Sequence, residues 1–258
     1  MRHAMARLKK LIPNAKAHSF AIAFAGLAFG LPAQVAVAQD ASSTHPVVVE
    51  LFTSQGCSSC PPADALLAEI ANRDDILALA LHVDYWDYIG WKDDFADPKF
   101  TLRQRAYAHA AGHRTVYTPH MVVNGSEHLG GFEPMKLADL IIERKRKLQN
   151  SNISLSARRS GDTLAISMAS KQRSPSDLRV QVVHFHPLER VAIRFGENRG
   201  KTIDYANIVT SWTRVGDWNG RADVKFNVPL ASSDPVAVVI QEDINGLPGE
   251  IVAAVRVQ

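Results

Sequence analysis

The sequence has little cysteine: only Cys57 and Cys60 occur in 258 residues. Small disulfide-stapled folds need several bridges, so the chain does not belong to that class. A second CxxC motif, which a four-cysteine zinc site requires, is also missing. A bridge between residues three apart closes a very short loop, and short loops gain the least stability from a disulfide. The scarcity of cysteine therefore indicates that the pair serves chemistry and does not hold the fold together.

Positive charge is also scarce once the N-terminus is set aside. Residues 1–38 contain a basic stretch, an apolar run over residues 20–31 and a small-residue site ending at Ala38, a pattern typical of a secretory signal. We expect cleavage after Ala38 and a periplasmic or secreted mature protein with no membrane anchor. An uncleaved anchor is the alternative, although two glycines and a proline interrupt the apolar run.

The expected mature chain does not have the charge of a nucleic-acid-binding protein. Five of the 29 basic residues lie in the leader, which leaves 24 against 26 acidic residues and a net charge of about −2. The one basic block, at residues 143–147, lies on a helical pattern and is more simply a solvated face. No phosphate loop or nucleotide fingerprint is found. We therefore expect no nucleic-acid partner.

The first half of the mature chain alternates strands and helices. Apolar runs at residues 47–53 and 76–83 predict buried strands, and a helical pattern at residues 61–72 lies between them. A β-α-β order implies parallel strands with a right-handed crossover. Further predicted elements are a helix at residues 98–111 capped by Asp97, a hairpin of residues 116–123 and 127–129 around Asn124-Gly125, and a helix at residues 134–148.

The second half reads as short alternating strands without a convincing helix, a pattern typical of an antiparallel sandwich or barrel. The eight expected strands are residues 153–157, 163–168, 180–186, 201–209, 211–218, 222–228, 236–241 and 251–257. The predicted fold class is therefore an α/β domain, residues 39–150, followed by an all-β sandwich domain, residues 151–258.

The Cys57-Ser58-Ser59-Cys60 motif indicates thiol-disulfide exchange. A thiol at the entry to a helix faces unpaired N–H groups and the positive end of the helix dipole, which favour the thiolate. Cys57 is then the attacking nucleophile, and Cys60, about one turn later, resolves the mixed disulfide. The hypothesis requires a Cys57 sulfur that substrates can reach. The expected partners are protein or peptide thiols and disulfides, and no cofactor is expected.

Two other readings of the motif stay open. A copper or zinc binding module could combine both cysteines with a histidine, for which the candidates are His82, His109, His113, His120 and His128. Alternatively, the pair could be a static bridge on an interaction protein. His184 and His186 have ligand-like spacing on a predicted strand, but Glu189 is their one acidic neighbour. The sequence predicts neither the direction of electron flow nor the oligomeric state.

Three segments carry a family resemblance: ELFTSQGCSSCPPAD at residues 50–64, HVDYWDYIGWKD at residues 82–93 and YTPHMVVNG at residues 117–125. Together with the order of elements, residues 46–149 resemble the thioredoxin superfamily. The segments more closely resemble a family of secreted bacterial thioredoxin-like proteins that is catalogued as a domain of unknown function. The resemblance implies that the α/β domain is thioredoxin-like, but it implies no particular substrate.

The resemblance also implies roles for three residues. Pro119 would follow a cis peptide bond and lie against the redox motif, and Thr118 would offer its backbone to an extended substrate. Glu50 matches a buried acid that moves the proton of the resolving cysteine, although it lies seven residues before Cys57 where six is usual. A solvated Glu50 at a sheet edge is the alternative.

Other positions depart from the thioredoxin pattern. Gly56 stands where a tryptophan commonly precedes the first cysteine, and Pro61-Pro62 follows Cys60 directly. The two prolines predict that the helix begins at Pro61, which would weaken the effect of its dipole on Cys57. Trp86, in the aromatic and acidic segment after the second strand, is a candidate substrate contact, with packing over the core as the alternative.

Overall fold

The computed structural model describes residues 45–172, 174 and 176–257. The expected signal segment and its cleavage site lie outside the described residues. The elements, in chain order, are β1 (Val47–Thr53), α1 (Pro61–Ile70), β2 (Ile76–His82), η1 (Asp87–Ile89), α2 (Pro98–Ala110), β3 (His120–Val123), β4 (Glu127–Gly130), α3 (Pro134–Gln149), β5 (Ile153–Ser160), β6 (Thr163–Ser170), β7 (Asp177–Ala192), β8 (Thr202–Trp218), β9 (Val224–Pro229), β10 (Val236–Ile244) and β11 (Leu247–Val257).

Local sequence patterns predicted the order of strands and α-helices in the first half correctly, although β3 begins at His120 where the predicted strand began at residue 116, and η1 was not predicted. β1 and β2 are parallel and in register from Val47 opposite Ile76 onward, with α1 as their crossover. Asp97 caps α2, and its side chain accepts a hydrogen bond from the N–H of Lys99 at 2.8 Å. Asn124 and Gly125, the first two of the three residues between β3 and β4, both have positive φ, +51° and +78°, which an Asn-Gly pair adopts readily.

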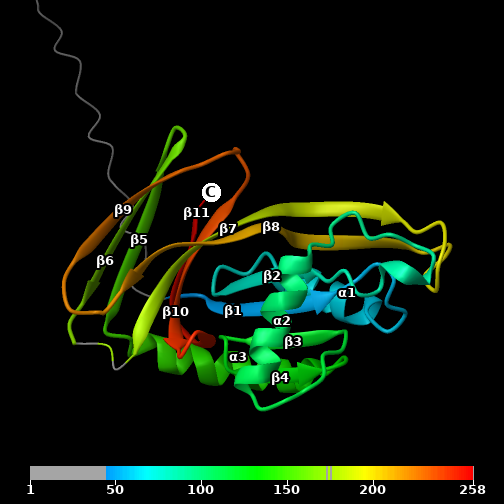
Figure 1. Cartoon of the computed structure of the whole chain (residues 1–258), viewed down its shortest axis with the longest axis horizontal. Helices are drawn as coiled ribbons and strands as arrows, with labels where there is room; N and C mark the ends of the chain where they lie inside the picture. Colours follow the sequence, from blue (N-terminus) through cyan, green and yellow to red (C-terminus); the bar gives the residue numbers. More distant parts are fainter. Residues whose placement is uncertain (1–44, 173, 175, 258) are drawn as a thin grey trace, which may run out of the picture. The chain divides into compact units, whose positions relative to one another are not determined.

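The largest element of the structure is an eight-stranded mixed sheet in the order β11-β10-β7-β8-β2-β1-β3-β4 (Figure 1). The two halves of the chain meet where β8 pairs in parallel with β2, Ala80 opposite Ile208. Next to this pair, the Asn207 side chain donates a 2.8 Å hydrogen bond to the carbonyl of Ala78 on β2. The first four strands of the chain and four later ones therefore share one sheet.

This architecture contradicts the predicted fold class of a thioredoxin-like α/β domain followed by an all-β sandwich domain. The described chain is mostly β, and four strands that follow residue 150 extend the first-half sheet. Only β5, β6 and β9 form a separate, three-stranded sheet. Its apolar side chains pack against β7, β10 and β11. Residue 150, the predicted boundary, lies between α3 and β5.

A second correction concerns β8. The sequence predicted two strands, residues 201–209 and 211–218, but one 17-residue strand forms there and pairs with the 16-residue β7. The register shifts at Thr210: Val209 lies opposite Phe185 and Ser211 lies opposite His184, so Thr210 has no partner in the pairing. An extra residue of this kind reverses the alternation of side chains, which explains why one strand looked like two.

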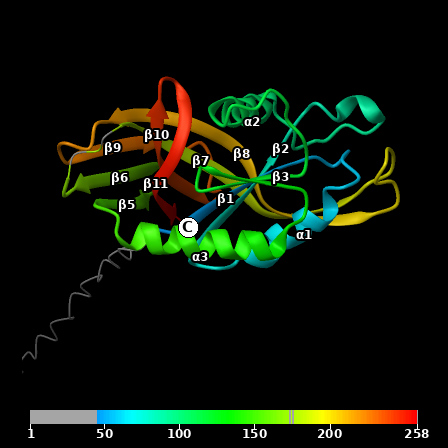
Figure 2. The ribbon, with the colours of Figure 1, turned by 90° about the horizontal axis from the view of Figure 1, so that it is seen from below.

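The two faces of the sheet carry different helices. Figure 2 shows α1 and α3 on one face and α2 on the other. On β1, Val49 and Leu51 share a core with Leu67 of α1, whereas Phe52 shares a core with Tyr107 of α2. Because side chains alternate along a strand, odd-numbered residues of β1 face α1 and even-numbered ones face α2. None of the helices in the described residues has the length and apolar character that a membrane crossing needs.

Candidate functional site

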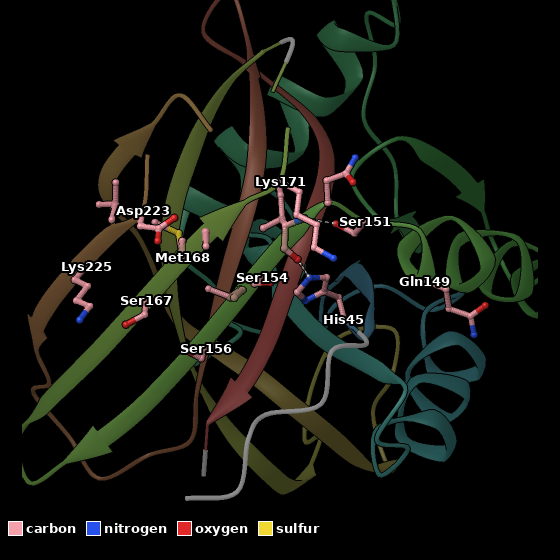
Figure 3. A pocket seen from close by; sticks show the side chains of 15 residues that line it. His45, Gln149, Ser151, Ser154, Ser156, Ser167, Met168, Lys171, Asp223 and Lys225 are labelled. Carbon is pink, nitrogen blue, oxygen red and sulfur yellow. Dashed lines mark hydrogen bonds between the residues drawn. The ribbon is translucent and has the colours of Figure 1, made fainter. Parts of the chain in front are cut away.

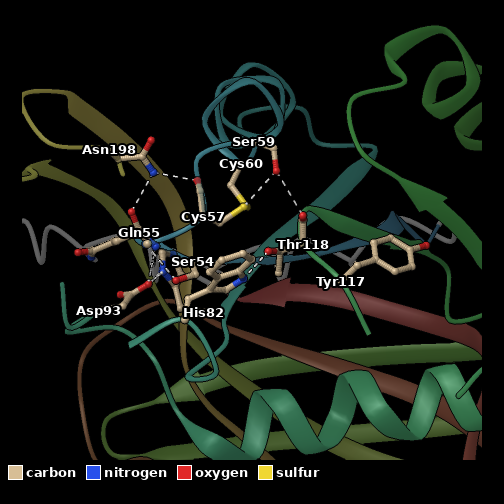
Figure 4. The surroundings of a disulfide bond; sticks show 12 residues. Ser54, Gln55, Cys57, Ser59, Cys60, His82, Asp93, Tyr117, Thr118 and Asn198 are labelled. Atoms are coloured by element: carbon tan, nitrogen blue, oxygen red, sulfur yellow. Dashed lines mark hydrogen bonds and ion pairs between the residues drawn. A yellow bond between two sulfur atoms is a disulfide. The ribbon is translucent and has the colours of Figure 1, made fainter. Parts of the chain in front are cut away.

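Cys57 and Cys60 form a disulfide in the turn between β1 and α1, with their Cα atoms 5.4 Å apart (Figure 4). Pro61 is the first residue of α1 and Cys60 its N-cap, as the double proline predicted. The N–H of Cys57 donates to the carbonyl of Ser54 at 3.1 Å, and that of Cys60 to the carbonyl of Cys57 at 3.2 Å. Cys57 therefore lies in a tight turn ahead of the helix.

Neither cysteine has exposed surface in this disulfide form. Cys57 and Cys60 are both 0% exposed, whereas Ser58 and Ser59 between them are exposed. The Ser59 hydroxyl lies 3.4 Å from Cys57 Sγ. The expectation of a reachable Cys57 sulfur is therefore wrong for this state, since the exposed two-serine turn lies between the bridge and solvent.

The three predicted substrate contacts come together beside this turn. The Thr118-Pro119 peptide bond is cis, as expected, and Pro119 is buried. The carbonyl of Thr118 accepts a hydrogen bond from the Ser59 hydroxyl at 3.4 Å. The indole N–H of Trp86 donates to the Thr118 hydroxyl at 2.7 Å. Trp86 therefore holds the Thr118 side chain, while the Thr118 carbonyl faces the Cys57–Cys60 turn.

The turn is also held by a residue that sequence reasoning did not identify. The Asn198 side chain, from the connection between β7 and β8, donates to the carbonyls of Gln55 at 2.9 Å and Cys57 at 2.8 Å. Trp91 adds a hydrogen bond from its indole N–H to the Gln55 side chain at 2.7 Å. Asn198 lies 141 residues after Cys57, and no local pattern signals such a contact.

The structure does not bring Glu50 to the cysteines. Glu50 is fully buried on β1, but it is even-numbered and faces α2. Its carboxylate accepts hydrogen bonds from Arg103 at 2.6 and 2.9 Å and from the Tyr107 hydroxyl at 2.5 Å. The alternation of side chains along β1 could have shown that Glu50 and α1 lie on opposite faces.

Asp64 is the acid that lies on the cysteine side of the sheet. It follows Cys60 by four residues, and its N–H donates to the Cys60 carbonyl at 3.1 Å. Asp64 is 2% exposed, and neither carboxyl oxygen has a hydrogen-bond partner among the described residues. Burial, the largest influence, raises the pKa of Asp64 to about 7, against the opposing effects of His82 and Thr53. The four-residue spacing from Cys60 was the signal that could have identified it.

Asp64 belongs to an interior polar cluster at the ends of β1 and β2. His82 Nδ1 lies 2.7 Å from Asp93 Oδ2, and the same oxygen accepts the N–H of Gln55 at 2.8 Å. Two further groups, His82 Nε2 and the Tyr205 hydroxyl, are buried without a partner among the described residues. Burial, as the main cause, raises the pKa of Tyr205. The interior polar cluster consists of Thr53, Asp64, His82, Asp93 and Tyr205.

The remaining histidine candidates lie elsewhere. His113, His120 and His128 gather near β3 and β4, on the side of the sheet that carries α2. His186 lies 3.6 Å from Asp234, and both residues are half-buried. Within residues 45–257, apart from the undescribed 173 and 175, no three His, Cys, Asp or Glu side chains are arranged to hold a metal ion.

A surface pocket of about 470 Å³ lies on β5 and β6 (Figure 3). Its lining is mostly polar and includes His45, Lys171, Asp223 and Lys225. His45 is anchored there by hydrogen bonds to the carbonyls of Ile153 and Ala254. The pocket shares no residue with the cysteine site, so it adds nothing to the chemistry of that site.

Residues 48–241 match the model of a protein family that is described as Protein of unknown function (DUF1223). A crystal structure of a protein from Agrobacterium tumefaciens is similar, with a TM-score of 0.72 and 33% identity over 85% of this chain and 95% of that one. HBP35 of Porphyromonas gingivalis has a TM-score of 0.61 and 15% identity over 83% of this chain and 75% of its own, a likeness of fold alone. No curated protein matches the chain.

Proposed function

The chain belongs to the DUF1223 family of proteins of unknown function, and from the site itself we propose that Cys57 and Cys60 exchange disulfides with protein or peptide thiols. The family match suggests no particular activity, so support for the proposal comes from the residues of the site. The observation that carries the proposal is the carboxyl group of Asp64, which is buried one helical turn beyond Cys60 and makes no hydrogen bond of ordinary length to the described residues. Burying such a group without a partner costs free energy, and a static disulfide has no use for it.

Asp64 suits the proton transfer that exchange requires. In the reduced protein, the Cys57 thiolate attacks a substrate disulfide, a mixed disulfide forms and one substrate thiolate leaves. Cys60 then loses its proton to Asp64 and attacks Cys57 Sγ, which closes the Cys57–Cys60 bridge and releases the second substrate thiolate. Side chains four residues apart on a helix have Cβ atoms about 5–6 Å apart, within reach of a proton directly or through one water. A pKa of about 7 provides both protonation states of Asp64 at neutral pH.

The resemblance to the thioredoxin superfamily supports the same chemistry at two motifs, although the fold of the whole chain differs. One motif is the CxxC pair directly ahead of a helix, and the other is the Thr118-Pro119 segment beside it. In this proposal the Thr118 carbonyl, now bonded to Ser59, binds the backbone of an extended substrate. Export to an oxidising compartment, as the sequence of residues 1–38 predicts, fits a protein that works with disulfides.

Exchange requires a local movement, since the bridge is covered in its oxidised state. The cover is small: Ser59 is exposed, and its contacts with Cys57 Sγ and the Thr118 carbonyl are both 3.4 Å long. A substrate that takes over the Thr118 carbonyl would release Ser59 and expose Cys57. Large substrates with a backbone to bind should therefore react faster than small thiols.

Burial of both cysteines favours a second candidate, a static bridge on an interaction protein. The reduction potential of the Cys57–Cys60 couple separates the two. The protein is equilibrated in thiol buffers of defined potential, and the reduced fraction is read by alkylation and mass. Redox activity predicts a potential within the range of known exchange proteins, about −270 to −120 mV, with turnover of protein disulfides. A value below about −300 mV without turnover would instead support the static bridge.

Asp64→Asn should stabilise the protein most strongly in alkaline solution. A raised carboxyl pKa means that the folded state binds more protons than the unfolded one between pH 3.8 and about 7, so stability falls as pH rises through that window. Between pH 5 and pH 8 the wild type should lose about 2–3 kcal/mol of unfolding free energy through Asp64, and the asparagine variant should not lose it. Urea unfolding of both proteins at the two pH values measures the difference.

The same variant should lose the dependence of exchange rate on pH near 7, because asparagine can neither accept nor release the proton of Cys60. Glu69→Gln, an exposed change on the same helix, is the matched control and should alter neither property. A stability gain that is equal at pH 5 and pH 8 would contradict the assignment of Asp64 as a titrating group.

A further inference from the structure

A row of hydrogen bonds behind the Thr118 segment joins α2 to β4. Gln104 Nε2 donates to the carbonyl of Tyr117 at 2.7 Å and lies 3.4 Å from His120 Nδ1. His120 Nε2 lies 3.0 Å from His128 Nδ1. The row therefore runs from the backbone beside Thr118, through Gln104 and His120, to His128.

The direction of every bond in this row follows from its first member. A carbonyl can only accept, so the Gln104 atom facing Tyr117 is the NH₂ group, and its oxygen accepts from the Tyr85 hydroxyl at 3.2 Å. His120 Nδ1 must then be an acceptor, which places the single proton of a neutral His120 on Nε2. That N–H donates to His128 Nδ1, which therefore carries no proton.

This arrangement holds only while both imidazoles are neutral. A second proton on His128 would sit on Nδ1 and face the N–H of His120, so two donors would meet. His120 cannot escape by moving its proton to Nδ1, because that nitrogen faces the NH₂ group of Gln104. Protonation of either ring therefore removes a hydrogen bond from the row.

The surroundings of the two rings favour the neutral forms. His120 is 3% exposed and stacks on Phe52, and its pKa falls to about 3, first by burial and then by the nearby His128 and His113. Burial and then His113 also lower the pKa of His128, while Glu127 and Glu50 oppose this. The other titratable neighbours are Tyr107, 6.1 Å from His128 between ring centres, and Tyr117, 4.9 Å from His120.

His128 is the residue of the row that solvent protons can reach, since it is half-buried while His120 is buried. We propose that Gln104, His120 and His128 are positioning residues that hold the Tyr117-Thr118 backbone against the Cys57-Ser58-Ser59-Cys60 turn. In this proposal protonation of His128 in acidic solution loosens that hold, because His120 then loses the bond that keeps its Nδ1 toward the Gln104 amide. The role of Thr118 as a substrate contact rests on the proposed function, whereas the proton-sensitive hold on the backbone does not.

The test compares the wild type with His128→Gln, whose side-chain oxygen can accept from His120 but cannot be protonated near neutral pH. Hydrogen–deuterium exchange is measured at pH 7 and pH 4 in peptides covering residues 115–123, with the disulfide intact. Comparing the proteins at one pH cancels the intrinsic effect of pH on exchange. At pH 7 the two should agree within about twofold, and at pH 4 the wild type should exchange about tenfold faster.

His113→Gln is the matched control, because it removes a neighbouring imidazole outside the row and should leave the acid-induced increase in place. Equal exchange by wild type and His128→Gln at pH 4 would overturn the proposal. If His128→Gln is already loosened at pH 7, ¹⁵N spectra of the wild-type histidines decide instead: both rings neutral with the proton on Nε2 supports the row, and a proton on His128 Nδ1 at pH 7 refutes it. Failed disulfide turnover by the wild type would remove the proposed function and leave this measurement unaffected.

Discussion

Cys57→Ser should abolish the proposed disulfide turnover, whereas Cys60→Ser should retain the first attack and accumulate mixed disulfides. The asymmetry follows from position: Cys57 lies in the turn beside the Thr118 carbonyl, and Cys60 is the N-cap of α1 with Asp64 one turn beyond it. Without Cys57 no thiolate can attack, so the rate should fall to the uncatalysed background. Without Cys60 nothing resolves the mixed disulfide, which then persists.

The measurement is turnover of a disulfide-containing peptide by each variant, with mass spectrometry of the trapped species. Ser58→Ala is the matched control, since it alters the exposed turn without touching either sulfur and should retain most of the activity. A turnover rate in Cys57→Ser equal to that of the wild type would contradict the proposed exchange chemistry. Failure of Cys60→Ser to form an adduct, while the wild type turns over, would reverse the assigned roles of the two cysteines.

Arg103→Met should destabilise the fold by about 3–5 kcal/mol, the usual cost of leaving a buried charge without its partner. Arg103 makes two hydrogen bonds to the fully buried Glu50, and its guanidinium group lies 3.6 Å from the ring centre of Trp212. It also donates to the side chain of Gln241 at 3.2 Å. The network thus ties β1 and α2 to β8 and β10, and its loss weakens the contact between the two halves of the chain.

Urea unfolding measures this loss as a lower midpoint. The slope of the unfolding free energy against urea concentration should stay unchanged, which shows that stability alone has altered. Arg105→Met is the matched control on the same helix; Arg105 is exposed, and its replacement should change stability by less than about 0.5 kcal/mol. The double variant Glu50→Leu/Arg103→Met should recover much of the loss, because it removes both charges together. A single variant as stable as the control would show that the pair contributes nothing to the fold.

Most of the local structure could be predicted from the sequence. The helix start at Pro61, the cap at Asp97 and the turn at Asn124-Gly125 were predictable because each depends on side chains within a few residues. Strand pairing was not, since the pairing of Ala80 with Ile208 joins residues 128 positions apart and depends on nothing in either local pattern. For this reason one continuous sheet was mistaken for two separate domains.

The site was predictable only in part for the same reason. Cys57, Thr118 and Trp86 were identified from local motifs, and the structure brings them together. Glu50 was placed on the wrong side of the sheet although strand alternation could have excluded it, and Asp64 was overlooked although it lies one helical turn beyond Cys60. Asn198 had no signal at all in the sequence.

The pairing of β2 with β8 decides how far the chain can be shortened. A fragment ending at residue 150 would keep β1 to β4, but it would leave β2 as an open edge that could pair with other molecules. It would also lack Asn198, which holds the carbonyl of Cys57, and Gln241, which bonds to Arg103. Residues from both halves of the chain therefore hold the Cys57–Cys60 turn, so the first half alone would lack contacts that fix the turn as well as a partner for β2.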